Sequence, residues 1–460
     1  MAFKATIGLE IHAELKTRTK MFCACINDPD EKTPNLNICP VCMAHPGSLP
    51  VINKEAVKKV LLIGTALGGN LADYTEFDRK NYFYPDIPKG YQISQYKYPL
   101  VSGGSLADVS ITRVHLEEDT ARSQHVAGLA DQAGQSLVDY NRAGVPLMEL
   151  VTEPVIHDAK TAGNFARELQ LLLRYLGAGE ANMEKGEMRV EANISVSADE
   201  NLGTKVEVKN LNSFRSVERA IAYEIERQTK ELEKGGTVVQ ETRGWDEVKQ
   251  VTFSQRKKES SHDYRYFPDP DLPNLKIPEI QEFSKESLKK DLPELPWEKR
   301  ERYRTLGFLQ EQDIEQLVSD SELSNLLLQI EQILVEPALI KTAANFILND
   351  VVGQRRKDPT WPLPDATFLA EVVRNYQNGT MAAPQAKSSI LSGQMSAAIS
   401  DTGALDAIAR KVVNAYPQVA ADYKGGKESA LQFLVGQGMK ESKGSANPAV
   451  LRDAILKVLQ

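Results

Sequence analysis

Cysteine is scarce in this 460-residue chain, and all four cysteines lie between positions 23 and 42. The sequence has no apolar run of about eighteen residues, so we expect no membrane span. Its N-terminus lacks a basic region followed by an apolar core, which argues against a secretory signal. Two disulfides would add little to so large a chain and nothing indicates an oxidising compartment, so we expect a cytoplasmic protein with reduced thiols.

The pattern of a P-loop, G-x-x-x-x-G-K-[ST], is also missing, which excludes nucleotide binding of that type. The stretch YKGGKES at 423–429 contains only a fragment of it. The stretch VSGGSLAD at 101–108 is similar to Gly-Gly-Ser segments of amidases but lacks their flanking residues. We interpret it as a hairpin turn between strands.

The chain has no overall excess of positive charge, since its formal net charge is −8. This value excludes a uniformly basic nucleic-acid surface but not a local one. From Arg410 to the C-terminus there are eight Lys or Arg against four Asp or Glu. Such an asymmetry indicates an appended binding module, and an ordinary solvated surface is the alternative.

Residues 1 to about 290 combine strand and helix patterns. The stretches ATIGLEIHAEL, EMRVEANISV and TKVEVKN alternate apolar with polar residues, as half-buried strands do. Helical patterns run from 53 to 67, from 158 to 176, and from 213 to the glycine pair at 235–236. A proline-rich stretch closes this region, and beyond Trp297 the pattern is helical, with a small helical module in the last fifty or so residues.

The four cysteines are spaced as Cys-x-Cys, thirteen residues, and Cys-x2-Cys. Two tight turns with this spacing can place four thiolates around one tetrahedral zinc ion. Four cysteine ligands leave no open coordination position, so the pattern predicts a structural zinc site; buried or unpaired thiols are the alternative. The predicted zinc ligands are Cys23, Cys25, Cys39 and Cys42.

A second group of residues favours catalysis. Glu10 and His12 are two apart on a predicted strand and project from the same face. Glu191 and Glu207 lie on the polar faces of other strands, and HLEEDTAR at 115–122 adds further carboxylates. Converging carboxylates repel unless a cation lies among them, and oxygen ligands with one imidazole suit Mg²⁺ or Mn²⁺. A solvated polar strand face is the alternative.

The chain contains six longer motifs in this order: GLEIHAEL, FDRKNYFYPDIPKGYQISQY, HLEEDTAR, DYNRAGVPLMELVTEP, KVEVKNLNSFRSVERAI and HDYRYFPDPDLP. Together they resemble the B subunits of aspartyl/glutamyl-tRNA amidotransferases (the GatB/GatE family), and the match extends to the tail. The resemblance implies an α+β fold. It consists of a glutamine-synthetase-like catalytic core with an antiparallel sheet, a helical domain, and a small YqeY-like tail that binds tRNA. We expect these parts at 1–292, 293–400 and 401–460, with the cysteine loop at 22–42.

The resemblance also implies a reaction. ATP and Mg²⁺ are used to phosphorylate the side-chain carboxylate of mischarged Glu-tRNA(Gln) or Asp-tRNA(Asn). Ammonia released by a glutaminase A subunit then displaces the phosphate, and a small C subunit joins A to B. The chain lacks an amidase Ser-Ser-Lys signature, which fits a subunit that receives ammonia.

Site residues follow from the matching motifs. The implied magnesium ligands, which with Lys80 form the predicted catalytic set, are Glu10, His12, Glu118 and Glu191. Glu118 is preferred to Glu117 because it matches the family's metal-binding glutamate, and Glu191 replaces an Asp of many relatives. The predicted ATP-binding residues are Arg79, Lys80, Glu207 and Lys209. The predicted tRNA-binding residues are Lys424, Lys427, Lys440 and Lys443, expected on glycine-flanked turns.

Two other functions remain open from the sequence. One is a non-catalytic, zinc-containing scaffold that binds tRNA. The other is a free-standing ligase that uses the same core on a small acid, although the basic tail and the missing ammonia-generating site argue against it. Alanine substitutions in the predicted catalytic set distinguish the scaffold from an enzyme.

Overall fold

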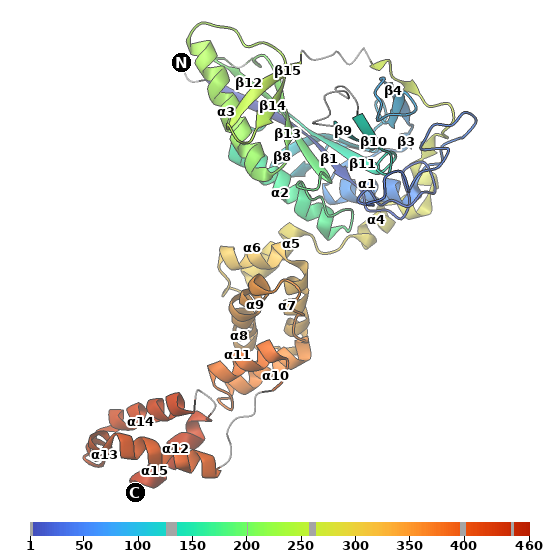
Figure 1. Cartoon of the computed structure of the whole chain (residues 1–460). Helices are drawn as coiled ribbons and strands as arrows, with labels where there is room; N and C mark the ends of the chain where they lie inside the picture. The colour runs from blue at the N-terminus through green and yellow to red at the C-terminus, as the bar shows by residue number, and fades with distance from the viewer. Residues whose placement is uncertain (1–2, 126–135, 200, 257–263, 396–401, 443–445) are drawn as a thin grey trace. The chain divides into compact units, whose positions relative to one another are not determined.

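The computed structural model describes residues 3–125, 136–199, 201–256, 264–395, 402–442 and 446–460. They form two compact units, Met1–Pro296 and Trp297–Gln460 (Figure 1). The first unit is built on β-sheet and the second is helical, in agreement with the predicted α+β class. Among the described residues, no helix is both long and apolar enough to cross a membrane.

The main sheet of the first unit has ten strands within the described part of the chain, and neighbours are antiparallel except for the pair β13–β14. In spatial order the strands are β15 (Val251–Arg256), β14 (Thr242–Asp246), β13 (Val206–Leu211), β12 (Met188–Ser197), β1 (Lys4–Glu14), β11 (Pro146–Thr152), β8 (Val109–Glu118), β6 (Val101–Ser102) and β2 (Asn70–Leu71), and β7 (Ser105–Leu106) also pairs with β8.

Three smaller sheets accompany it. In one hairpin β9 (Arg122–His125) pairs with β10 (Ser136–Asp139). A three-stranded sheet places β4 (Asp78–Asn81) between β5 (Tyr91–Ser94) and β16 (Phe267–Pro268). A third pairs β3 (Tyr74–Thr75) with β17 (Leu275–Lys276). Because β16 and β17 belong to the proline-rich stretch, that stretch returns to the early strands and closes the first unit.

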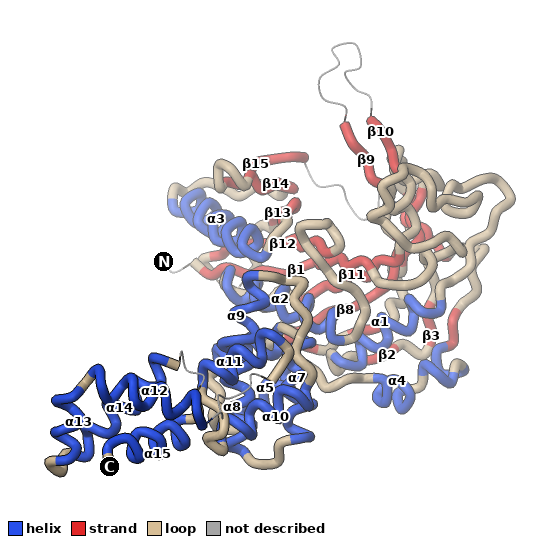
Figure 2. Tube along the Cα trace, turned by 60° about the horizontal axis from the view of Figure 1, so that its bottom comes forward, coloured by secondary structure: helices blue, strands red, loops and turns tan. Residues whose placement is uncertain are grey.

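The three predicted helices are α1 (Lys54–Ala66), α2 (Ala159–Tyr175) and α3 (Phe214–Glu233). Each begins after a side chain that accepts backbone N–H bonds, namely Asn53, Asp158 and Ser213, as the sequence predicted. They lie along one side of the main sheet, and the β9–β10 hairpin rises from the other side (Figure 2). The turns η3 (Ile277–Glu279) and η4 (Gln281–Phe283) lead into α4 (Lys285–Asp291), which packs on α1.

The predicted alternation of β1 is confirmed. Ile7, Leu9 and Ile11 are buried, and the residues between them are only half-buried. The apolar residues of β12 are buried in the same way, and α3 packs on this strand. One face of the sheet is therefore core, and the opposite face is left to polar side chains.

The glycine pair at 103–104 is not the hairpin turn itself. Both glycines have positive φ and separate β6 from β7, which pair with the same strand β8. The tight turn lies at Ala107 and Asp108, which also have positive φ. Gly104 is required because a Cβ there would lie 2.8 Å from the carbonyl oxygen of Leu67.

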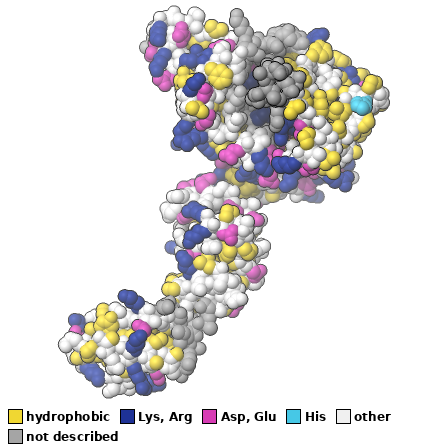
Figure 3. All heavy atoms as spheres, in the orientation of Figure 1, with side chains coloured by type: hydrophobic (Ala, Val, Ile, Leu, Met, Phe, Trp, Pro, Cys, Tyr) yellow, Lys and Arg dark blue, Asp and Glu magenta, His cyan; other side chains and the backbone are white. Residues whose placement is uncertain are grey.

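The second unit consists of helices. Its first group is α5 (Pro296–Thr305), α6 (Glu311–Ser319), α7 (Ser321–Ile333), α8 (Pro337–Phe346), the π turn η5 (Ile347–Val351), α9 (Val352–Lys357), α10 (Ala366–Gln377) and α11 (Ala383–Ser392). The last group is α12 (Thr402–Ala415), α13 (Pro417–Lys424), α14 (Glu428–Glu441) and α15 (Pro448–Leu459), which share a core that includes Leu405, Leu434 and Ile455. Lys and Arg side chains are spread over the visible face of this last group (Figure 3).

Candidate active site

Polar side chains from four adjacent strands meet on the open face of the main sheet. His12 on β1 lies opposite Glu149 on β11, and Glu149 lies opposite His115 on β8. On the other side of β1, Glu10 lies opposite Glu191 on β12. Since paired residues point to the same face, the register alone brings these groups together.

His12 is the centre of this cluster. Its Nε2 lies 3.4 Å from Oε2 of Glu149, 3.5 Å from Oε1 of Glu117 and 3.9 Å from Oε1 of Glu10. Burial lowers the pKa of His12, but the hydrogen bond and charge of Glu149, with the other carboxylates, outweigh it and raise the pKa to about 9. The imidazole is thus surrounded by negative charge.

Glu10 shows that this charge is not fully compensated. Burial, together with repulsion from Glu149 and Glu191, raises the pKa of Glu10 to about 7. Ligand atoms of Glu10, His12 and Glu149 lie within 4.8 Å of one another, and so do those of His115, Glu117 and Glu149. Oxygen-rich donors at this spacing, with an excess of negative charge, fit a hard divalent cation.

A neighbouring group contains the predicted residues of β12 and β13. Lys209 Nζ lies 2.7 Å from Oε2 of Glu191 and 3.8 Å from Oε2 of Glu207. Thr242 on β14 donates a hydrogen bond of 2.8 Å to Glu207. Ligand atoms of Glu10, Glu191 and Glu207 also lie within 4.8 Å of one another. Glu10 therefore belongs to both groups and joins them.

Lys80 on β4 faces the cluster from the small sheet. Burial lowers its pKa, but the charges of Glu117, Tyr266 and Glu149 outweigh burial and raise the pKa above the usual value. The ammonium group also lies 5.2 Å from the ring centre of Tyr264. The result is one permanent positive charge opposite several carboxylates.

Several of these residues open into one cleft of about 590 Å³, whereas His115, Glu149 and Glu207 lie behind its wall. Its lining residues are Glu10, His12, Lys80, Tyr82, Phe83, Tyr84, Asp86, Gln92, Glu117, Asp119, Thr120, Leu147, Arg189, Glu191, Lys209 and Tyr264. A cleft of this size accepts a substrate the size of a nucleotide, with carboxylates, imidazole and two lysines at its wall.

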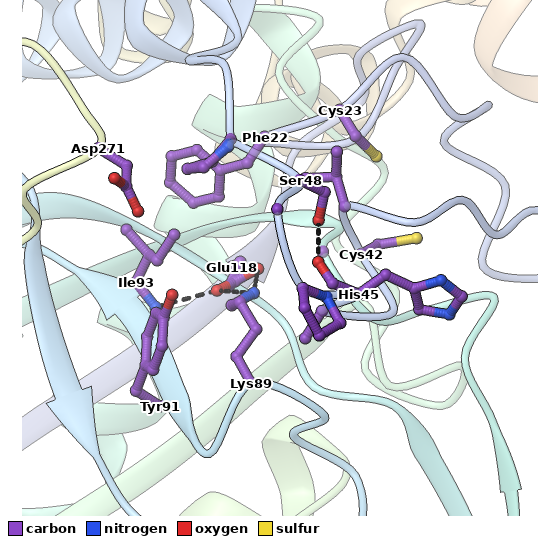
Figure 4. Close-up of a pocket in the computed structure, with 16 residues that line it drawn as sticks. Phe22, Cys23, Cys42, His45, Ser48, Lys89, Tyr91, Ile93, Glu118 and Asp271 are labelled. Carbon is purple, nitrogen blue, oxygen red and sulfur yellow. Dashed lines mark hydrogen bonds and ion pairs between the residues drawn. The ribbon is translucent and has the colours of Figure 1, made fainter.

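Two predicted residues lie elsewhere, which corrects the predicted grouping. Glu118 points to the opposite face of β8 from Glu117, accepts a hydrogen bond from the backbone N–H of Ile93, and pairs with Lys89 at 2.6 Å. It lines a separate cavity of about 230 Å³ beside the cysteine loop (Figure 4). Arg79 likewise points away from Lys80 on β4, and its guanidinium pairs with Asp269 and Asp271. Strand alternation is the physical reason in both cases.

The structure also brings in residues that the sequence did not single out. Glu149 is buried and contacts both His12 and His115, with Arg113 at 3.3 Å. Glu117 takes the position that was predicted for Glu118. A signal for Glu149 was present in PLMELVT, where it is the single charged residue of an otherwise apolar and uncharged run that forms β11.

The cysteine cluster is compact. Ligand atoms of Cys23, Cys25, Cys39 and Cys42 lie within 4.8 Å of one another, and no disulfide joins them. The backbone N–H of Cys39 donates to Sγ of Cys42 at 3.1 Å. A hydrogen bond from Cys23 and the positive charge of Lys20 lower the pKa of Cys42 to about 5. The thiols are thus arranged as a set that fits one tetrahedral metal ion.

The tail lysines are only partly on turns. Lys424 ends α13 before two glycines, and Lys427 precedes α14 with its Nζ 3.7 Å from Asp422. Lys440 lies in the last turn of α14, so its environment is helical and the predicted turn is wrong there. Lys443 lies outside the described residues. Contact of these lysines with tRNA stays a prediction.

Comparisons with known proteins agree along nearly the whole chain. Residues 5–281 match the family model described as the GatB/GatE catalytic domain, and residues 328–459 match the one described as the GatB domain. A relative in Thermus thermophilus is 44% identical over 480 residues, covering 99% of both chains. One in Thermotoga maritima is 40% identical over 486 residues, covering both chains fully. Each of these relatives is named as the B subunit of an aspartyl/glutamyl-tRNA(Asn/Gln) amidotransferase.

Proposed function

This chain belongs to the GatB/GatE family, and from this premise we propose that it acts as the B subunit of a tRNA-dependent amidotransferase. Its substrate is a tRNA mischarged with glutamate or aspartate. The side-chain carboxylate of that amino acid is phosphorylated by ATP, and ammonia then displaces the phosphate to give the amide. The observation that carries the proposal is the cleft in which Glu10, Glu117 and Glu191 converge with His12 and Lys80, while the buried Glu149 contacts His12.

The reaction needs such a site because a carboxylate is a poor electrophile and its oxygen a poor leaving group. Transfer of a phosphoryl group to the carboxylate solves both problems, since phosphate leaves readily when ammonia attacks. Phosphoryl transfer in turn depends on positioning and on compensation of negative charge. A cleft with both acidic and cationic groups can supply these functions.

Different residues of the cleft have different roles in this reaction. Glu10, His12, Glu117 and Glu149 would hold Mg²⁺, with Glu191 at its edge. Mg²⁺ bound there supplies charge compensation for the transferring phosphoryl group. Lys80 binds phosphate oxygens directly, because its raised pKa keeps it charged at neutral pH. Lys209 orients Glu191 and Glu207 through its ion pairs.

The cysteine cluster has a structural role in this proposal. Four thiolates would saturate Zn²⁺, which leaves no position for substrate. The cysteine loop is anchored to the turn after β10, since the backbone N–H of Asn37 donates to Asn141 and Lys20 donates to the carbonyl of Tyr140. Zinc therefore fixes a loop beside the cleft.

The tail α12–α15 contributes tRNA affinity through its lysines, and the A and C subunits supply ammonia and hold the complex together.

The test uses the chain assembled with its A and C partners, Mg²⁺, ATP and ammonium chloride in place of glutamine. Mischarged Glu-tRNA(Gln) should drive ADP release and become Gln-tRNA(Gln). Glu10→Ala and His12→Ala should abolish both. Glu153→Gln is the matched control. Glu153 comes directly after β11 of the same sheet, but its carboxylate accepts a hydrogen bond from Thr112 and does not line the cleft. If all variants formed product, the cluster around Glu10 and His12 would have no catalytic role and the chain would act as a scaffold.

A further inference from the structure

Arg189 is the one arginine among the described residues that line the cleft. It lies on β12 opposite His12 of β1 and two positions before Glu191, so it belongs to the polar face that carries the acidic cluster. Its side chain is 40% exposed, whereas that of Asp119, its ion-pair partner, is 2% exposed. The guanidinium thus extends from a buried anion into the cleft.

Asp119 fixes the position of this guanidinium. Its Oδ2 accepts a hydrogen bond of 2.8 Å from Nη2 of Arg189, and its Oδ1 accepts one of 2.8 Å from the backbone N–H of Thr120. The backbone of Asp119 is held as well, because its N–H donates to the carbonyl of Val145 and its carbonyl accepts from the N–H of Gly144. With both its carboxylate and its backbone bonded, Asp119 orients Arg189 before any ligand binds.

The bond to Asp119 uses only part of the donor capacity of Arg189. A guanidinium has five N–H donors, and this is the one hydrogen bond that Arg189 makes within the described part of the chain. Arg142 differs in this respect. Its Nε lies 3.7 Å from the same Oδ2 of Asp119, but its guanidinium donates to the carbonyls of Thr120 and Ala121. Donors of Arg189 are therefore available to a ligand in the cleft, whereas those of Arg142 are used within the fold.

We propose that Arg189 binds an oxyanion of the reacting groups and that Asp119 positions it for this contact. A guanidinium can keep one N–H on Asp119 while it offers others to a carboxylate or a phosphoryl group, which an ammonium group cannot do in the same geometry. In the proposed reaction the side-chain carboxylate of the substrate and the transferred phosphoryl group of ATP must meet in this cleft. Two such anions repel each other unless cations compensate their charge. The inference rests on the proposed function and adds a substrate-binding residue to it.

The experiment compares Arg189→Lys and Arg189→Ala with the wild type in the assembled complex, using ammonium chloride as nitrogen donor. Lysine keeps a cation beside the buried Asp119, so this variant should fold. It cannot serve Asp119 and a substrate in the same geometry, and a hydrogen bond between charged groups accounts for about ten- to hundredfold in affinity or rate. We expect kcat/KM for amide formation to fall by at least about tenfold in Arg189→Lys and further in Arg189→Ala.

The two substrates distinguish the source of the oxyanion. A rise in the KM for Glu-tRNA(Gln) alone assigns Arg189 to the side-chain carboxylate, and a rise in the KM for ATP alone assigns it to the phosphoryl group. A fall in kcat with both KM values unchanged assigns it to the charge that develops during transfer. Binding of Mn²⁺ should stay at the wild-type level in Arg189→Lys, because a guanidinium is not a ligand of the cation.

Arg167→Ala is the matched control. The side chain of Arg167 is 44% exposed and also pairs with a carboxylate, that of Glu218, but Arg167 lies on α2 and does not line the cleft. A kcat/KM of Arg189→Lys within twofold of the wild type would overturn the inference. A parallel loss of Mn²⁺ binding would overturn it too, since the substitution would then act through the acidic cluster. If the wild type itself formed no product, the proposed function would fail, and this contact with it.

Discussion

Glu10 provides the most specific test of the acidic cluster, because its carboxylate destabilises the folded protein in the absence of a cation. Its pKa is raised from 4.5 to about 7 by burial and by Glu149 and Glu191. A carboxyl group whose pKa is higher in the folded state binds its proton more tightly there. Stability is therefore lost as the pH rises from 4.5 through 7, and an ionised Glu10 costs at most about 3 kcal/mol above pH 7.

Glu10→Gln keeps the shape and removes the charge. In EDTA at pH 8.5 the variant should be more stable than the wild type by about 1–3 kcal/mol, and at pH 4 the difference should vanish. Adding Mg²⁺ should stabilise the wild type and have little effect on the variant. Urea unfolding followed by the fluorescence of Trp245, in a background where Trp297 and Trp361 are phenylalanine, reports on the sheet, since Trp245 lies buried on β14. A variant less stable than the wild type in EDTA at pH 8.5 would refute this reasoning.

Three further predictions concern the neighbouring groups. Glu117→Gln should weaken Mn²⁺ binding, measured by electron paramagnetic resonance, at least about tenfold. Glu118→Gln should leave that Mn²⁺ signal unchanged, because Glu118 forms an ion pair with Lys89 instead. An equal loss of Mn²⁺ binding in both variants would restore the predicted role of Glu118. Cys42→Ser should remove bound zinc, measured by metal analysis, while Mn²⁺ still binds the cleft; retention of one zinc per chain would rule out the thiol site. Tyr303→Phe removes a buried hydroxyl that lies 2.8 Å from Ser324, so the helical unit should lose about 1 kcal/mol in thermal unfolding with no change in amide formation at 25 °C.

The sequence predicted much of this site because strand alternation is a local property. Glu10, His12, Glu191, Glu207 and Lys209 were expected on polar strand faces, and they lie together on the open face of the sheet. The three helix starts were also correct, since capping depends on a few adjacent residues.

Register between strands could not be predicted in the same way. Alternation shows that Glu117 and Glu118 face opposite sides, but only the pairing of β8 with β11 shows that Glu117 shares a side with Glu149. The same holds for Arg79 and Lys80 on β4, whose sides are set by the three-stranded sheet. Glu149 was missed because the strand around it is apolar, and its partners His12 and His115 are distant in sequence.

The claim that this cleft activates a carboxylate by phosphorylation has one direct test. Glu-tRNA(Gln) labelled with ¹⁸O in the side-chain carboxylate is incubated with the assembled complex, Mg²⁺, ATP and ammonium chloride. Because the phosphate leaves with one carboxylate oxygen, one ¹⁸O per Gln-tRNA(Gln) should appear in inorganic phosphate, and His12→Ala should release none. Amide formation with unlabelled phosphate would contradict the account.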